Sequence, residues 1–177
     1  MTLRYATLAV SSAIALAGCS TMSGSAGMDE LASAPMIDTT GNSVGSVRLM
    51  DEGARRVMRV ELTGIAPGPH GFHLHTTGTC TTPDFQSAGG HLNPTNNEHG
   101  SLNPDGKHLG DLPNIEVGAN GSVTTQVALD ESRDALMAAL FDSDGTAVMV
   151  HSGADDYRTD PSGDAGSRIA CGVLTRS

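Results

Sequence analysis

Six of the seven histidines in this 177-residue chain fall into three short clusters, and one aspartate accompanies the second cluster. The clusters are His73 and His75; His91, His99, His108 and Asp111; and His151 alone. Side chains two residues apart in an extended strand point to the same face, so the first pair can share one ion. Imidazole nitrogens suit copper and zinc, and a carboxylate oxygen that completes a His-rich tetrahedron suits zinc. The sequence therefore predicts a two-metal site.

The second cluster lies in a stretch that is rich in Gly, Asn and Pro, between residues 88 and 111. Such a composition is typical of a loop, and a loop can fold its ligands around one ion. A single histidine is more often a surface or hydrogen-bonded residue than a metal ligand. The His-x-His pair and the loop cluster together favour metal binding over that interpretation.

Five motifs follow one another along the chain: His-Gly-Phe-His-Leu-His, Gly-Gly-His-Leu-Asn-Pro, His-Leu-Gly-Asp-Leu-Pro-Asn, Val-His-Ser-Gly-Ala-Asp-Asp and Gly-Ser-Arg-Ile-Ala-Cys-Gly-Val. Together they closely resemble the Cu/Zn superoxide dismutases, specifically the secreted bacterial branch, over about residues 33–177. The resemblance implies an enzyme, an oxidoreductase with copper and zinc as cofactors. Its substrate would be the superoxide anion. Two superoxide ions and two protons would become dioxygen and hydrogen peroxide through Cu(II)/Cu(I) cycling.

The resemblance also implies a role for each residue of the motifs. Copper would be held by His73, His75, His91 and His151. Zinc would be held by His91, His99, His108 and Asp111. His91 would bridge both ions as an imidazolate and later donate a proton, and Arg168 would position the anion beside copper. Asp155, rather than its neighbour Asp156, would link a copper histidine to a zinc histidine, and His70 would be a structural hydrogen-bonding residue.

The N-terminus has the pattern of a secretory signal. Residues 1–18 hold one basic residue and an apolar run, and they end in Leu-Ala-Gly before Cys19. The run is too short for a membrane-spanning helix, and the ending resembles a bacterial lipoprotein box. We therefore expect lipidation at Cys19, a flexible tether over residues 19–32 and a periplasmic domain over residues 33–177, anchored to the outer membrane by lipid alone. The alternative is an ordinary signal peptide.

The chain has three cysteines, an odd number for an exported protein. Assigning Cys19 to the lipid leaves Cys80 and Cys171 as a pair, which an oxidising compartment would keep as a disulfide. A reactive or metal-binding cysteine pair is the alternative.

Short apolar or alternating segments separated by turn residues predict strands. They are residues 43–50, 56–62, 71–76, 122–129, 146–151 and 169–175. Only residues 130–140 have helical spacing. Evenly spaced strands indicate an all-β fold, an antiparallel sandwich or flattened barrel in one domain, to which the resemblance adds Greek-key connections and long metal-binding loops.

The net charge of −10 argues against a nucleic-acid partner. The same negative charge would repel an anionic substrate, and few basic residues are in place to guide that substrate. Lys107 and Arg158 are the candidates. Two other functions stay open: a non-catalytic metal-binding module, and a zinc hydrolase, which would need an open zinc position. A homodimer is also left open.

Overall fold

A computed structural model describes residues 1–2 and 28–177, so the signal segment and Cys19 lie outside the described residues. Strands dominate the described chain: β1 (Asp29–Asp38), β2 (Ser43–Asp51), β3 (Arg56–Thr63), β4 (Gly68–His75), β5 (Asp111–Val117), β6 (Ser122–Leu129), β7 (Ala147–His151), β8 (Arg168–Val173) and β9 (Thr175–Arg176). The helical elements are the 3-10 helix η1 (Gln86–Ala88) and the α-helix α1 (Arg133–Leu140). Within this part of the chain, no helix is long and apolar enough to cross a membrane.

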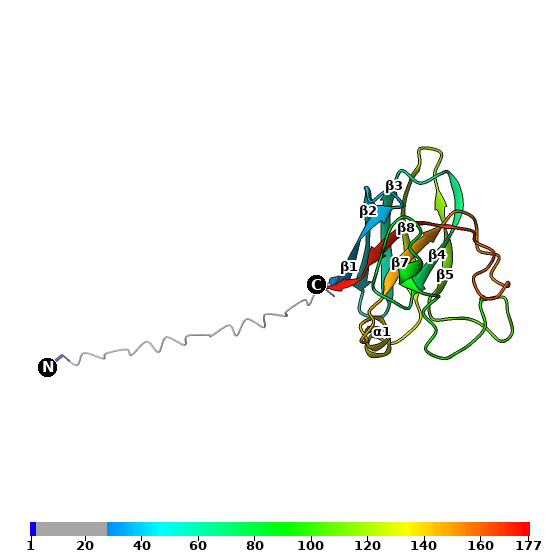
Figure 1. The fold of residues 1–177 in the computed structure, drawn as a ribbon. Coiled ribbons are helices and arrows are strands. Elements are labelled where there is room, and N and C mark those ends of the chain that lie inside the picture. Colours follow the sequence, from blue (N-terminus) through cyan, green and yellow to red (C-terminus); the bar gives the residue numbers. More distant parts are fainter. Residues whose placement is uncertain (3–27) are drawn as a thin grey trace.

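The strands form one antiparallel sheet in the order β5-β4-β7-β8-β1-β2-β3-β6, with β9 paired to β1. The two ends of this order, β5 and β6, contact each other, so the sheet curls into a nearly closed barrel (Figure 1). The loops discussed below join strands that are neighbours both in the chain and in the sheet: residues 76–110 lie between β4 and β5, and residues 152–167 lie between β7 and β8. The all-β prediction is confirmed.

The core follows from the alternation of side chains along the strands. In β3, Met58, Val60 and Leu62 point inward and are buried, whereas Glu61 and Thr63 are exposed. Because aromatic residues are scarce, Val, Leu, Ile, Ala and Met fill most of the barrel, with Phe72 as its buried aromatic side chain.

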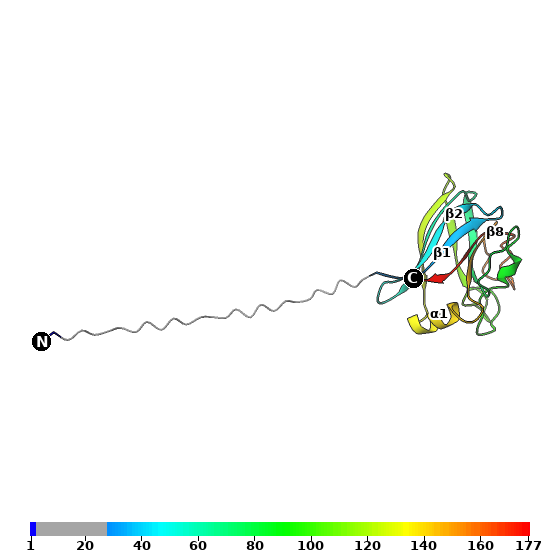
Figure 2. The same ribbon diagram turned by 60° about the vertical axis from the view of Figure 1, so that its left-hand side comes forward.

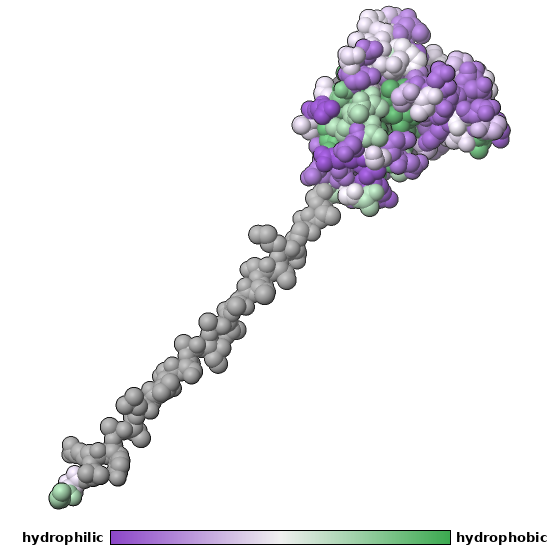
Figure 3. All heavy atoms as spheres, turned by 90° about the horizontal axis from the view of Figure 1, so that it is seen from below, coloured by the Kyte–Doolittle hydropathy of each residue, from purple (hydrophilic) through white to green (hydrophobic). Residues whose placement is uncertain are grey.

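The six predicted strands are all present, with ends that differ by a few residues at most. The predicted helix is also present but begins at Arg133, because the side chain of Ser132 caps it by accepting a hydrogen bond from the backbone nitrogen of Ala135 at 3.3 Å. It lies across one end of the barrel (Figure 2). Figure 3 looks at that end and shows apolar surface there, next to a groove of about 510 Å³ that includes Leu109 and Ala138.

The predicted tether is four residues too long. Strand β1 begins at Asp29, so residues 29–32 belong to the domain, and Leu31 and Ala32 are buried in it. A register shift between Glu30 and Ala32 turns two successive side chains inward, which breaks the alternation that marks a strand in the sequence.

Candidate metal centre

Four histidines converge on the strands β4 and β7, which are antiparallel neighbours in the sheet. His73 and His75 lie on one face of β4, and His151 ends β7. His91 follows η1 and forms an isolated antiparallel bridge with His75, which brings the loop onto the strand. One ring nitrogen of each of the four lies within 4.8 Å of the others, and all four residues are buried.

In this first group, hydrogen bonds fix which ring nitrogen is available to a metal. His75 Nδ1 donates to the Gly89 carbonyl at 2.9 Å, and His151 Nδ1 donates to the Gly166 carbonyl at 3.1 Å. A carbonyl only accepts, so in a neutral ring the opposite nitrogen, Nε2, carries no proton. His73 is held the other way round, because its Nε2 donates to Asp155 Oδ2 at 2.7 Å.

The remaining nitrogens of this first group are buried and have no hydrogen-bond partner among the described residues. They are His73 Nδ1, His75 Nε2, His91 Nε2 and His151 Nε2. An unpartnered buried polar atom costs about 1–3 kcal/mol, so four of them in one place are not explained by packing. A metal bound by imidazole, such as copper, would satisfy all four.

The second group surrounds a single carboxylate oxygen. Asp111 Oδ1 lies 2.8 Å from His91 Nδ1, 3.0 Å from His99 Nδ1 and 3.1 Å from His108 Nδ1. Bonds of about 2.0–2.1 Å to a tetrahedral zinc place ligand atoms about 3.3 Å apart, close to these distances. The other oxygen, Oδ2, accepts hydrogen bonds from the backbone nitrogens of Gly100 (2.9 Å) and His108 (3.0 Å), which orients the carboxylate. The second group therefore fits zinc.

Asp155 joins the two groups. Its Oδ2 accepts from His73 Nε2 at 2.7 Å and its Oδ1 from His99 Nε2 at 3.0 Å, so one buried carboxylate holds a ligand of each group. Each bond leaves the Nδ1 of its histidine directed to the ligand side. Asp156 is exposed and bonds instead to Thr159.

The charges of the two groups follow from burial and these contacts. Burial opposes ionisation of Asp111, but hydrogen bonds from His91 and His99 outweigh it and hold the pKa of this carboxyl well below its usual range. Asp155 has a lowered pKa for the same reason, with His73 and His99 as its donors. Burial would lower the pKa of His99, yet the two carboxylates outweigh burial and raise it to about 9.

Three histidines of the first group have lowered pKa values instead. Burial, followed by the mutual repulsion of the rings, lowers the pKa of His75 to about 2, of His91 to about 4 and of His151 to about 3. All three are therefore neutral at pH 7, which is the form of histidine that binds a metal.

No local pattern in the sequence signals the clamp that holds Asp155. Asn114 in β5 makes a reciprocal pair with the backbone of Asp155: its Nδ2 donates to the carbonyl and its Oδ1 accepts from the nitrogen, both at 2.9 Å. The Tyr157 hydroxyl accepts from the Asn114 nitrogen at 2.8 Å, and the Tyr157 nitrogen donates to Asp155 Oδ1 at 2.6 Å. Asp160 accepts from the backbone of His99 at 2.8 Å, so this loop also holds the zinc side.

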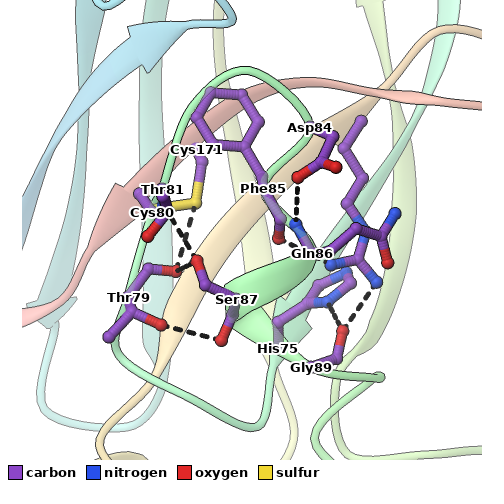
Figure 4. Close-up of a disulfide and its surroundings, with 11 residues drawn as sticks. His75, Thr79, Cys80, Thr81, Asp84, Phe85, Gln86, Ser87, Gly89 and Cys171 are labelled. Carbon is purple, nitrogen blue, oxygen red and sulfur yellow. Dashed lines mark hydrogen bonds between the residues drawn. A yellow bond between two sulfur atoms is a disulfide. The ribbon is translucent and has the colours of Figure 1, made fainter.

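Arg168 begins β8 and reaches across to the loop that carries His91. Its Nη1 donates to the Phe85 carbonyl at 2.7 Å and its Nη2 to the Gly89 carbonyl at 2.6 Å. Figure 4 shows this loop, with His75 and Gly89 joined by the bond described above. A pocket of about 700 Å³ opens over these residues and is lined by Arg168 together with His75, His91 and His151.

A disulfide joins Cys80 to Cys171, with a Cα–Cα distance of 5.7 Å. It ties the loop that contacts Arg168 to strand β8 (Figure 4). Arg168 is the first residue of that strand. The predicted pairing is confirmed, and the alternative of a reactive or metal-binding cysteine pair is wrong.

Three other charged or histidine residues lie away from the pocket. His70 is buried outside both groups, with its ring nitrogens 2.6 Å from the His151 carbonyl and 2.8 Å from the Ala66 carbonyl. Neither Lys107 nor Arg158 lines the pocket, and Arg158 donates to the Leu102 carbonyl instead. The basic residues considered as guides therefore do not surround the entrance.

Comparison with known proteins agrees with this geometry. The family described as "Copper/zinc superoxide dismutase (SODC)" matches residues 43–174. Superoxide dismutase [Cu-Zn] 2 of Aquifex aeolicus is 40% identical over 156 residues, which cover 86% of this chain and 91% of the relative. The superoxide dismutase-like protein YojM of Bacillus subtilis is 43% identical over 145 residues, which cover 78% and 73%.

Solved structures give the same result. A SOD-like protein from Bacillus subtilis is 40% identical with a TM-score of 0.75, covering 81% of this chain and 97% of that structure. The Cu/Zn superoxide dismutase from Brucella abortus is 30% identical with a TM-score of 0.65, covering 81% and 98%. The chain therefore belongs to the copper/zinc superoxide dismutase family, whose two metals match the two groups of ligands described above.

Proposed function

We propose that this oxidoreductase binds copper through its first group of histidines and zinc through its second group, and that it dismutates superoxide at the copper side. The copper ligands are His73, His75, His91 and His151. The zinc ligands are His91, His99, His108 and Asp111. The observation that carries the proposal is the convergence of four buried imidazole nitrogens that have no hydrogen-bond partner among the described residues. Three of the four rings, those of His75, His91 and His151, line the pocket that also contains Arg168.

His91 has a place in both groups. Its Nδ1 faces Asp111 at 2.8 Å, and its Nε2 belongs to the four unpartnered nitrogens. A ring that binds a cation at each nitrogen must lose both protons, and two nearby divalent cations make that loss feasible. When bound, copper supplies the one-electron oxidation and reduction of superoxide, whereas zinc is not redox active. A proton taken up at His91 Nε2 would lie beside the pocket, where the peroxide product needs it.

Arg168 supplies the fixed positive charge of the pocket. Its guanidinium cannot be deprotonated at working pH, and its planar fork of donors suits a small oxyanion. The two carbonyls that it contacts, those of Phe85 and Gly89, hold the fork in place next to His75. The reaction at this position converts two superoxide ions and two protons to dioxygen and hydrogen peroxide. A zinc hydrolase is disfavoured, because four protein ligands close the zinc position.

Metal analysis combined with activity tests the ligand partition. His151→Ala removes a ligand of the copper group alone, so copper and dismutase activity should be lost while zinc stays near one per chain. Asp111→Ala should weaken zinc and spare part of the copper-dependent activity. Asp105→Ala is the matched control, because this exposed carboxylate lies in the same loop and is in neither ligand group. A His151→Ala protein that loses zinc and keeps copper would show that the partition is wrong.

We also propose that the protein is exported, lipidated at Cys19 and held at the bacterial outer membrane on the periplasmic side. The support is the sequence pattern of residues 1–19, which lies outside the described residues apart from residues 1–2. Cys19→Ala should release the protein from the membrane fraction, with the metal content and activity of the exported domain unchanged. Membrane association as tight as that of the wild type would contradict lipidation.

A further inference from the structure

The pocket above the two ligand groups is lined by few charged residues. Apart from its three histidines, two of its lining residues can carry a charge at pH 7: Arg168 and Asp84. The rest of the lining is neutral and includes Thr39, Gln86 and Ser162. Among the side chains, one cation therefore faces the approaching substrate together with one anion, and no lysine lines the pocket.

Asp84 is fixed at this entrance by its own loop. It directly precedes Phe85, whose carbonyl accepts from Arg168, and its Oδ1 accepts a hydrogen bond from the Gln86 nitrogen at 3.1 Å (Figure 4). No salt bridge within 4.0 Å joins Asp84 to Arg168 among the described residues. The two charges still act on each other, since burial lowers the pKa of Arg168 while the charge of Asp84 raises it.

A carboxylate at the entrance acts on anions in proportion to their charge. Its repulsion of a dianion is twice its repulsion of a monoanion at the same distance, so its effect on the binding constant of the dianion is about the square. Superoxide is a monoanion, whereas phosphate is mostly a dianion slightly above pH 7. The same residue therefore penalises phosphate more than it penalises the substrate.

We propose that Asp84 is a specificity-determining residue, which admits superoxide to the pocket while it holds down the affinity of competing multivalent anions such as phosphate. The proposal rests on the proposed function, because that function assigns superoxide to this pocket. The carboxylate lowers the rate with superoxide slightly, and in exchange Arg168 stays available in a medium that contains phosphate. A purely structural role would need only the hydrogen bond to Gln86.

Asp84→Asn separates the charge from the hydrogen bond, because the amide oxygen can still accept from the Gln86 nitrogen. The copper- and zinc-loaded protein is titrated with azide, a monoanion, by following the Cu(II) absorption band. Phosphate affinity is measured at pH 8 by competition with azide, and the superoxide rate constant is measured by pulse radiolysis at low ionic strength. Glu116→Gln is the control, since it makes the same change in net charge at an exposed position of β5 that does not line the pocket.

The expected result is a graded effect. In water, a unit charge about 10 Å away changes monoanion affinity by about twofold. Azide affinity and the superoxide rate should therefore rise about twofold, and phosphate affinity about fourfold. Glu116→Gln should leave all three near the wild-type values. Equal rises for azide and phosphate, no rise at all, or the same rises in Glu116→Gln would overturn the proposal. The two anion titrations need no turnover, so an inactive protein with the expected titrations would refute the proposed function and leave the role of Asp84 standing.

Discussion

Neutralising Arg168 should lower the second-order rate constant with superoxide at every ionic strength. In Arg168→Gln the amide can replace one of the two hydrogen bonds to the Phe85 and Gly89 carbonyls, but it carries no charge. The variant therefore removes the attraction for the anion and preserves part of the anchoring of the loop. Arg168→Lys keeps the charge without the fork and gives an intermediate case.

The size of the effect follows from the position of the guanidinium. Two unit charges at a contact distance of about 4 Å interact by about 1 kcal/mol in bulk water and about 4 kcal/mol at an effective dielectric constant of about 20. The pocket opens to solvent, but its base is formed by buried histidines, so the interaction lies between these limits. We expect a loss of at least about 1.4 kcal/mol, which is a tenfold or larger fall in the rate constant.

Pulse radiolysis at several ionic strengths is the assay, with metal content and thermal unfolding measured in parallel. The Debye length is about 10 Å at 0.1 M salt, so distant acidic residues are screened before the guanidinium that contacts the substrate. The wild-type rate should therefore fall only weakly, or rise, between low and physiological salt. The reasoning is refuted if fully metallated Arg168→Gln keeps more than half of the wild-type rate constant. A steep fall of the wild-type rate with salt would reveal a basic guiding surface elsewhere.

Two further predictions concern stability. Tyr157→Phe removes the acceptor of the Asn114 nitrogen, which should cost about 1 kcal/mol and lower the melting temperature by about 2–4 °C, with activity little changed; an unchanged melting temperature would show that water replaces the hydroxyl. The metal-free protein should lose stability as the pH falls from 7 to 5, because its buried histidines have lowered pKa values and stay neutral while those of the unfolded chain take up protons below about 6.5. The groups responsible are His75, His91 and His151, opposed by the raised pKa of His99. Thermal unfolding at both pH values measures this, and greater stability at pH 5 would contradict it.

The sequence predicted the grouping of the ligands because their residue types and spacing are local. His73 and His75 share a face by strand geometry alone. The approach of His151 to them depends on the pairing of β7 with β4, which no local pattern specifies. For that step the resemblance to a known family was needed.

Of the three strands that escaped prediction, β1, β5 and the two-residue β9, the first two did so for identifiable physical reasons. β1 contains two alanines and a proline, which are poor strand formers, and its register shifts break the alternation. β5 begins with Asp111 of the second ligand group and contains Pro113, a residue that is typical of loops. A proline is tolerated here because β5 lies at one end of the strand order, where the missing backbone donor leaves no ladder bond unmade, and Pro113 is exposed.

The Gly89 carbonyl shows why the position of the anion site and the orientation of a metal ligand cannot be separated in this chain. It accepts from both His75 Nδ1 and Arg168 Nη2, so it fixes the imidazole and the guanidinium relative to one atom. Gly89 adopts φ 73° and ψ −155°, and a Cβ there would lie 2.7 Å from Cγ2 of Thr76, so both backbone conformation and space require glycine. Any side chain at this position would move the carbonyl, and it would therefore disturb copper binding and anion docking together.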